Sequence, residues 1–167
     1  MNFALKAADR LAQGLALIAG LAVVAMLIHV ALDVGTRNLA GRPIPATNEI
    51  VSRYYMVAIA FLPLAWVERR DAMVKVELTD ALTSDRIGRW NDAIVALIAV
   101  VIYAGLSWVA WGEALDSAAK RTFVDVLGYR IATWPTFFLP AVGFAAAALA
   151  AGLRGILLIS GRREAAA

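Results

Sequence analysis

Cysteine is absent from the 167-residue sequence, and histidine occurs once, as His29. Without cysteine the chain has no disulfide framework, thiolate metal site or cysteine nucleophile. One histidine does not supply a histidine-cluster metal site, or a two-histidine haem clamp within one chain. Charged residues are also scarce, at 17%, against about 25% in an average soluble domain. These shortages argue against a soluble globular protein, whose surface needs more charge.

Hydrophobic residues make up 62% of the chain and gather in long stretches. Four stretches contain no Asp, Glu, Lys or Arg: residues 11–32, 54–67, 93–112 and 131–153. About 20 apolar residues in a helix span a bilayer, and the short second stretch approaches this length by taking residues 49–53 as its first turn. The sequence therefore predicts an all-α integral membrane protein, with a single membrane domain over residues 1–167. Its four transmembrane helices are expected at about 11–33, 50–67, 91–112 and 132–155.

A cleaved signal peptide is the alternative for the first stretch, which is longer than the usual core of such a peptide.

The distribution of Lys and Arg predicts the orientation of the helices. With both termini in the cytoplasm, ten of these residues fall on the cytoplasmic side and six on the outer side. Cytoplasmic loops carry the excess of positive charge, so we expect N-in, C-in. No basic cluster is dense enough to predict nucleic-acid binding.

The segments that connect the first three helices differ in character. Residues 38–48 contain one Gly and two Pro and predict a tight turn, with Thr47 or Asn48 capping the next helix. Residues 68–92 carry apolar side chains at roughly helical intervals among charges, and a helix capped by Ser84 would run directly into the third span. We expect an amphipathic arm on the membrane surface here. A solvated cytoplasmic loop is the alternative.

Two pairs of opposite charge flank the first connection. Asp33 and Arg37 are four residues apart at the end of the first helix, and Glu49 and Arg53 have the same spacing at the start of the second. Residues four apart share a helix face, and an acid that precedes the base is the favourable order. A charged side chain near the hydrocarbon has a high free-energy cost unless it is paired. Either each pair satisfies itself at the membrane interface, or its charges contact a partner or line an ion path.

Small residues recur at intervals of four on the fourth predicted helix, at Gly143, Ala147, Ala151 and Gly155. Such a stripe lets helices approach closely in lipid. It fits packing within the chain as well as a face for a partner. Pro63 and Pro140 predict kinks in the second and fourth helices.

No acidic residue lies deep within a predicted span, although a stand-alone secondary transporter or proton-coupled exporter usually needs one there. His29 lies near the end of the first helix. A histidine in that position is either a hydrogen-bonded packing residue or a proton relay or haem ligand. The sequence contains no phosphate loop, HExxH or GxSxG motif. The residues alone therefore predict a membrane scaffold that is not an enzyme and has no catalytic residue, cofactor or metal.

Whole segments follow the order of a known family. These segments are DVGTR (33–37), NE (48–49), ERR (68–70), MVKVEL (73–78), ATWP (132–135) and LPAVG (139–143). In this order, over about residues 11–158, the chain resembles the small membrane subunit (Q-type) of tripartite ATP-independent periplasmic (TRAP) transporters. Many members of that family carry a histidine where this chain has Met73, so Met73 is given no role.

The resemblance implies a multi-pass protein of the bacterial inner membrane that does not transport alone. It would act as a rigid brace for a large membrane subunit, which holds the substrate and sodium sites. A periplasmic binding protein would deliver the substrate, an organic acid anion. The candidate residues for contact with the large subunit are Asp33, Arg37, Glu49, Arg53, Trp134, Pro135, Gly143 and Ala147.

Three other functions fit the sequence less well. One is an unrelated four-helix membrane scaffold or regulatory protein. Another is a membrane enzyme or redox protein that uses His29, which would need a second haem ligand from elsewhere. The last is a small multidrug exporter, and the missing membrane-embedded glutamate counts against it.

Overall fold

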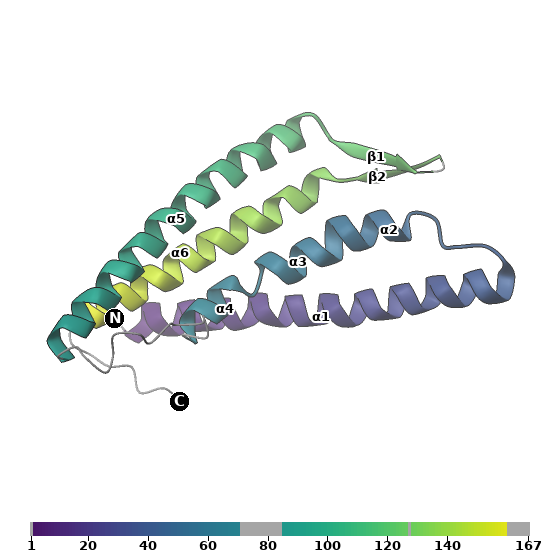
Figure 1. Ribbon diagram of the computed structural model, residues 1–167. Coiled ribbons are helices and arrows are strands. Elements are labelled where there is room, and N and C mark those ends of the chain that lie inside the picture. Colours follow the sequence, from purple (N-terminus) through teal and green to yellow (C-terminus); the bar gives the residue numbers. More distant parts are fainter. Residues whose placement is uncertain (1, 71–84, 127, 160–167) are drawn as a thin grey trace.

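The computed structural model describes residues 2–70, 85–126 and 128–159, and these are mainly helical (Figure 1). The three longest helices are α1 (Asn2–Ala40), α5 (Asp85–Ala119) and α6 (Phe138–Ile159). Four short helical pieces follow one another between α1 and α5: α2 (Thr47–Ile50), a π-helical segment (Val51–Tyr55), α3 (Met56–Phe61) and α4 (Leu64–Arg69). The connection from α5 to α6 contains β1 (Phe123–Val126), β2 (Tyr129–Ala132) and a 3-10 turn (Trp134–Phe137).

Four parts of this helical structure are long and apolar enough to cross a membrane. They are Leu5–Ala40, Thr47–Arg69, Asn91–Ala119 and Trp134–Leu158. The predicted fold class, an all-α membrane protein with four spanning helices, is therefore confirmed. The helices continue beyond the charge-free stretches of the sequence, because charged residues such as Arg37 and Glu113 lie exposed on their surfaces and do not end them.

The predicted interfacial arm falls largely on residues 71–84, which lie outside the described residues, as does the segment 73–78. The described structure resumes with α5, which begins at Asp85. From there α5 runs without a break into the third span. Ser84, at which the sequence predicts the cap of this helix, lies outside the described residues.

A proline divides the second span into two pieces. Leu62 and Pro63 separate α3 from α4, and the N–H groups of Trp66 and Val67 both bond to the carbonyl of Pro63. The sequence predicts a kink at Pro63, and the structure has a break there, because the missing N–H interrupts the helical ladder. Pro140 lies in the first turn of α6, where a missing N–H removes no helical bond. For this reason α6 runs unbroken past Pro140 to its end.

A β-hairpin, which the sequence pattern did not predict, connects α5 to α6. Its strands pair antiparallel, with Asp125 opposite Arg130 and Val126 opposite Tyr129. Gly128 turns the chain with a φ of +84°, and its N–H bonds to Oδ1 of Asp125 at 3.2 Å. The β-branched and aromatic residues on both sides of Gly128 are the signal that could have indicated these strands. Each strand has only four residues.

Helix α6 is the centre of the packing. It lies against α5 on one side and against α3 and α4 on the other (Figure 1). Helix α1 packs on α3 and α4 and makes a smaller contact with α6. Among the four spans α6 is the most buried and α1 the least. The spans therefore form an open row, with α5 and α1 at its two ends, rather than a closed bundle.

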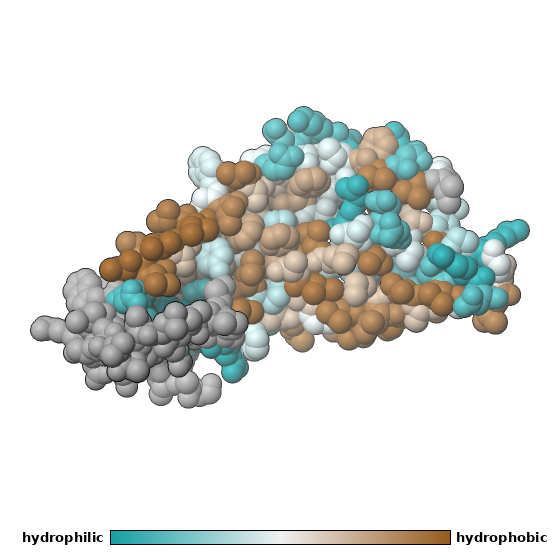
Figure 2. Space-filling view, viewed as in Figure 1, coloured by the Kyte–Doolittle hydropathy of each residue, from teal (hydrophilic) through white to brown (hydrophobic). Residues whose placement is uncertain are grey.

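Small side chains fill the contacts between these helices. One cluster contains Ala12, Ala65, Ala146 and Ala150, and a second contains Ala19, Ala58 and Leu62. Alanine at a helix interface lets backbones approach closely in lipid. Large apolar side chains point outward instead, including Leu17 and Leu21 of α1 and Leu97 and Val101 of α5. Figure 2 shows hydrophobic surface along the helices and hydrophilic surface gathered at the end where α1 meets α2.

Candidate functional site

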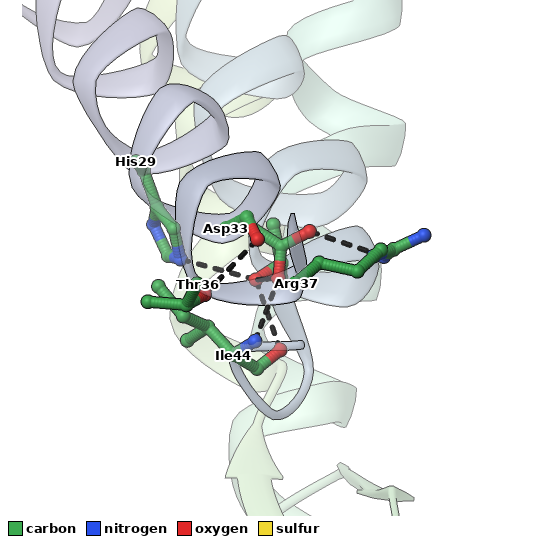
Figure 3. A network of polar contacts seen from close by, with 6 residues as sticks. His29, Asp33, Thr36, Arg37 and Ile44 are labelled. Carbon is green, nitrogen blue, oxygen red and sulfur yellow. Dashed lines mark hydrogen bonds and ion pairs between the residues drawn. The ribbon is translucent and has the colours of Figure 1, made fainter. Parts of the chain in front are cut away.

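A buried carboxylate, Asp33, organises the connection between α1 and α2 (Figure 3). Its Oδ1 accepts hydrogen bonds from the backbone N–H of Ile44 (2.7 Å) and from the hydroxyl of Thr47 (3.2 Å). Its Oδ2 accepts one from Nη2 of Arg37 (3.1 Å). The Asp33 side chain is 8% exposed, whereas that of Arg37 is 63% exposed. The predicted ion pair is therefore one of three interactions through which Asp33 holds the connection.

The backbone of the connection adopts two unusual conformations that these bonds support. Gly41 and Ala46 both have positive φ, at 67° and 62°. Glycine adopts this region freely, whereas for Ala46 the left-handed region is strained. Ala46 stands at the start of α2 and makes no side-chain cap. The capping role predicted for Thr47 or Asn48 is therefore wrong, since Thr47 is already the first helical residue and its hydroxyl bonds to Asp33.

His29 extends this cluster by one turn of α1. Its Nε2 lies 3.5 Å from the hydroxyl oxygen of Thr47, and its Nδ1 lies 3.5 Å from the hydroxyl of Tyr55. The hydroxyl hydrogen of Thr47 has two nearby acceptors, on Asp33 and on the carbonyl of Ile44. Its oxygen is then available to accept from Nε2–H, which leaves Nδ1 to accept from Tyr55. This arrangement fits a hydrogen-bonded packing residue that ties α1 to the π-helical segment.

The second predicted pair, Glu49 and Arg53, lies in a different environment. Nε of Arg53 is 2.9 Å from Oε2 of Glu49, and the two side chains are 43% and 26% exposed respectively. Within the described residues, neither side chain makes another hydrogen bond. The pair is therefore satisfied locally, yet it presents both charges on the outside of the second span.

Trp134 and Pro135 begin the 3-10 turn that leads from the hairpin into α6. The ring of Trp134 packs edge-on against Phe138, with 6.4 Å between the ring centroids. Beside this turn, the hydroxyl of Tyr54 donates to the carbonyl of Ala132, which fastens the hairpin to the second span. Trp134 is 37% exposed, so it both packs within the chain and presents part of its ring outward.

The small-residue stripe on α6 faces other helices of this chain. A Cβ added at Gly143 would overlap the carbonyl oxygen of Phe61 in α3. Ala147 and Ala151 are completely buried. Packing within the chain therefore accounts for Gly143 and Ala147, the first of the two alternatives that the sequence left open.

Two neighbouring residues at the end of α4 clamp three helices together. Oε1 of Glu68, whose side chain is 4% exposed, lies 3.5 Å from Nη1 of Arg154 in α6. Nε of Arg69 lies 2.6 Å from Oδ1 of Asp9 in α1, and the Arg69 side chain is 8% exposed. The sequence reasoning missed this clamp. The sequence feature that could have indicated the clamp is Arg154 in the last helix. A charged side chain near the hydrocarbon has a high free-energy cost unless it has a partner.

The buried polar side chains of the described structure are thus used in contacts within the chain. No buried side-chain nitrogen or oxygen among the described residues is without a hydrogen-bond partner. Across the same residues, no group of three or more His, Asp or Glu could hold a metal ion. The two clusters fix the ends of the helices: the Asp33 cluster joins α1 to α2, and the Glu68–Arg69 clamp joins α4 to α1 and α6.

One family model matches the chain over residues 26–160, and it describes the DctQ component of tripartite ATP-independent periplasmic transporters. The match covers most of the sequence, from the turn before His29 to the end of α6. This chain belongs to the DctQ family. No curated protein matches it closely enough to count as a relative.

The DctQ assignment confirms the resemblance to the small TRAP subunit. DctQ is the small permease component of a tripartite transporter, and the family is one of transporter components rather than of enzymes. With four helices suited to span a membrane, the chain is a multi-pass membrane protein. The family assignment replaces the alternatives of an unrelated scaffold, a redox protein and a small multidrug exporter.

Proposed function

We propose that this DctQ chain braces a large permease subunit in the bacterial inner membrane during uptake of an organic acid anion. In this proposal the large subunit binds the substrate and the coupling ion, sodium. A periplasmic binding protein delivers the substrate to the outer face. The chain lies N-in, C-in, so that the Asp33 cluster and the hairpin are on the periplasmic side.

The observation that carries the proposal is the open row of helices. α6 uses both of its sides for neighbours within the chain, while α1 and α5 leave broad apolar sides uncovered. The buried acids Asp33 and Glu68 lie near the ends of the spans and are engaged in bonds within the chain. A row of this kind supplies apolar surface to a partner, and its charges are used to keep the helices in place.

The exposed members of the candidate set are the proposed contacts with the large subunit. Arg37, Arg53 and Trp134 present charge or ring surface outward, and Glu49 accompanies Arg53. Asp33 and Pro135 act indirectly in this proposal, because they set the conformation of the two connections that carry these side chains.

Co-purification with a large permease subunit tests the proposal. We expect a tagged form of this chain, expressed with the large subunit, to recover a stable complex in mild detergent. Arg53→Ala should lower the recovery of the large subunit. Lys120→Ala is the matched control, because Lys120 also belongs to an exposed pair four residues apart, with Asp116 at 3.7 Å.

The possible results separate two claims. If the unmodified chain does not recover the large subunit, the proposed function is wrong. If it does, and Arg53→Ala recovers as much as Lys120→Ala, the pair of Glu49 and Arg53 is not a contact.

A further inference from the structure

The end of α4 and the first turns of α1 form a basic surface that none of the contacts above uses. Arg69 is buried and bonds to Asp9 of α1. This bond places the next residue, Arg70, beside the part of α1 that carries Lys6 and Arg10. Three basic side chains from two helices therefore lie around the same corner of the molecule.

The guanidinium of Arg70 is held in place by an aromatic ring. Its Cζ lies 5.2 Å from the ring centroid of Trp66, one turn earlier in α4. A cation over an indole face is attracted by the ring. Trp66 packs in turn against the cluster that contains Ala12 and Ala146. Arg70 is thus oriented by a rigid part of the fold, while the residue itself is exposed.

The positive charge at this corner is not compensated within the described structure. Asp9 and Glu68, the carboxylates of the Glu68–Arg69 clamp, are each paired with a buried or partly buried arginine. Lys6, Arg10 and Arg70 are all exposed, and none of them pairs with a described carboxylate. The side-chain N–H groups of Arg70 have no acceptor among the described residues, so they can bind an anion.

The sequence around this corner indicates its depth in a bilayer, and with it the kind of anion that lies at that depth. The charge-free stretch of α1 begins at residue 11, and that of the second span ends at residue 67. Arg10 and Arg70 therefore lie just outside the hydrocarbon, at the level of the headgroup phosphates, and Trp66 lies at the boundary that tryptophan prefers. Anionic headgroups attract basic residues at this depth, and a guanidinium can bind phosphate through two parallel hydrogen bonds.

We propose that this corner binds the headgroup of an anionic phospholipid, with Arg70 as the ligand of its phosphate. Trp66 supports the guanidinium, and Lys6 and Arg10 add attraction for the negative charge. The acyl chains would lie along the apolar side of α1. This inference is independent of the bracing role, because it concerns lipid rather than the large subunit.

Native mass spectrometry of the full chain in a neutral, lipid-free detergent tests this site. The chain is offered equal amounts of phosphatidylglycerol and phosphatidylcholine with the same acyl chains. We expect preferential retention of phosphatidylglycerol, and a loss of about fivefold in that preference for Arg70→Gln. Arg130→Gln is the matched control, because Arg130 also stacks on a ring, 3.9 Å from the centroid of Phe123. Arg130 lies in the hairpin, away from this corner.

The control and a competition experiment decide the interpretation. An Arg130→Gln variant that retains phosphatidylglycerol like the unmodified chain supports a specific site. Equal losses for both variants would mean that net charge alone retains the lipid, and the site would be refuted.

Inorganic phosphate should displace the lipid only at a large excess. Displacement at concentrations similar to that of the lipid would show a free-anion site and contradict the proposal.

Discussion

Asp33 and Glu49 each precede an arginine by four residues, but the two carboxylates have different roles in the structure. Asp33 is buried and also accepts hydrogen bonds from Ile44 and Thr47, whereas Glu49 bonds only to Arg53 within the described residues. Sequence spacing alone predicts both pairs and does not distinguish them. The difference arises from the connection after α1, which folds back so that an N–H group and a hydroxyl reach Asp33.

Replacement of Asp33 should therefore destabilise the protein, and replacement of Glu49 should not. Asp33→Ala leaves the N–H of Ile44 without its acceptor and removes the partner of Arg37, which should cost about 1–3 kcal/mol. Glu49→Ala removes an exposed pair worth no more than about 0.5 kcal/mol. Thermal unfolding in detergent, followed by circular dichroism, measures both. Equal unfolding midpoints for the two variants would contradict the anchoring role of Asp33.

At the scale of helices, the packing of α6 depends on the absence of a side chain at one position. Gly143 and Gly152 lie in the same helix, and both would gain helix propensity from replacement by alanine. A Cβ at 143 would overlap the backbone of Phe61, while a Cβ at 152 would lie 3.7 Å from Cγ2 of Val100, an ordinary contact. Replacement of glycine by alanine is therefore expected to destabilise the protein at position 143 and not at position 152.

Gly143→Ala should lower the free energy of unfolding by about 1–3 kcal/mol, because α3 and α6 must move apart. Gly152→Ala should leave it unchanged or raise it by up to about 1 kcal/mol. The unfolding midpoints of the two variants in the same detergent check this. A neutral Gly143→Ala variant would show that α3 and α6 do not approach closely at this point.

The hairpin should loosen when its bond to the second span is removed. Tyr54→Phe deletes the hydroxyl that donates to the carbonyl of Ala132, so hydrogen exchange at 123–132 should become faster while α6 stays protected. Tyr55→Phe is the control, since that hydroxyl faces His29 instead. If both variants exchange alike across the hairpin, the Tyr54 contact does not hold it.

The spanning helices could be predicted from the sequence because one property, the absence of charge over a long apolar stretch, decides them. The break at Pro63 also follows from local chemistry. The clamp formed by Glu68 and Arg69 could not be predicted, because its partners Arg154 and Asp9 lie in other helices and only packing brings them together. The hairpin was missed because its strands are short and its bond to Tyr54 connects residues far apart in the chain.

At the scale of the whole molecule, the orientation in the membrane is the first property to test. The chain has no cysteine, so single cysteines can be introduced without a background. In intact cells a membrane-impermeant maleimide should label Asn38→Cys, which follows Asp33 on the outer side. It should label Ala7→Cys only after the membrane is opened. Labelling of Ala7→Cys in intact cells would reverse the proposed N-in orientation.

The proposed bracing role depends on how the four spans are arranged. Its central helix is covered by its neighbours, its outer helices present apolar surface, and its buried charges hold the two ends together. In the proposed function, the apolar sides of α1 and α5 are the surfaces that support the large permease subunit.

Solute uptake by reconstituted vesicles tests this claim most directly. Vesicles that contain this chain, the large permease subunit and the periplasmic binding protein should take up an organic acid anion when a sodium gradient is present. Omission of this chain should abolish or sharply lower that uptake, and vesicles with this chain as their only membrane protein should show none. Uptake by this chain alone, or undiminished uptake without it, would contradict its role as a brace.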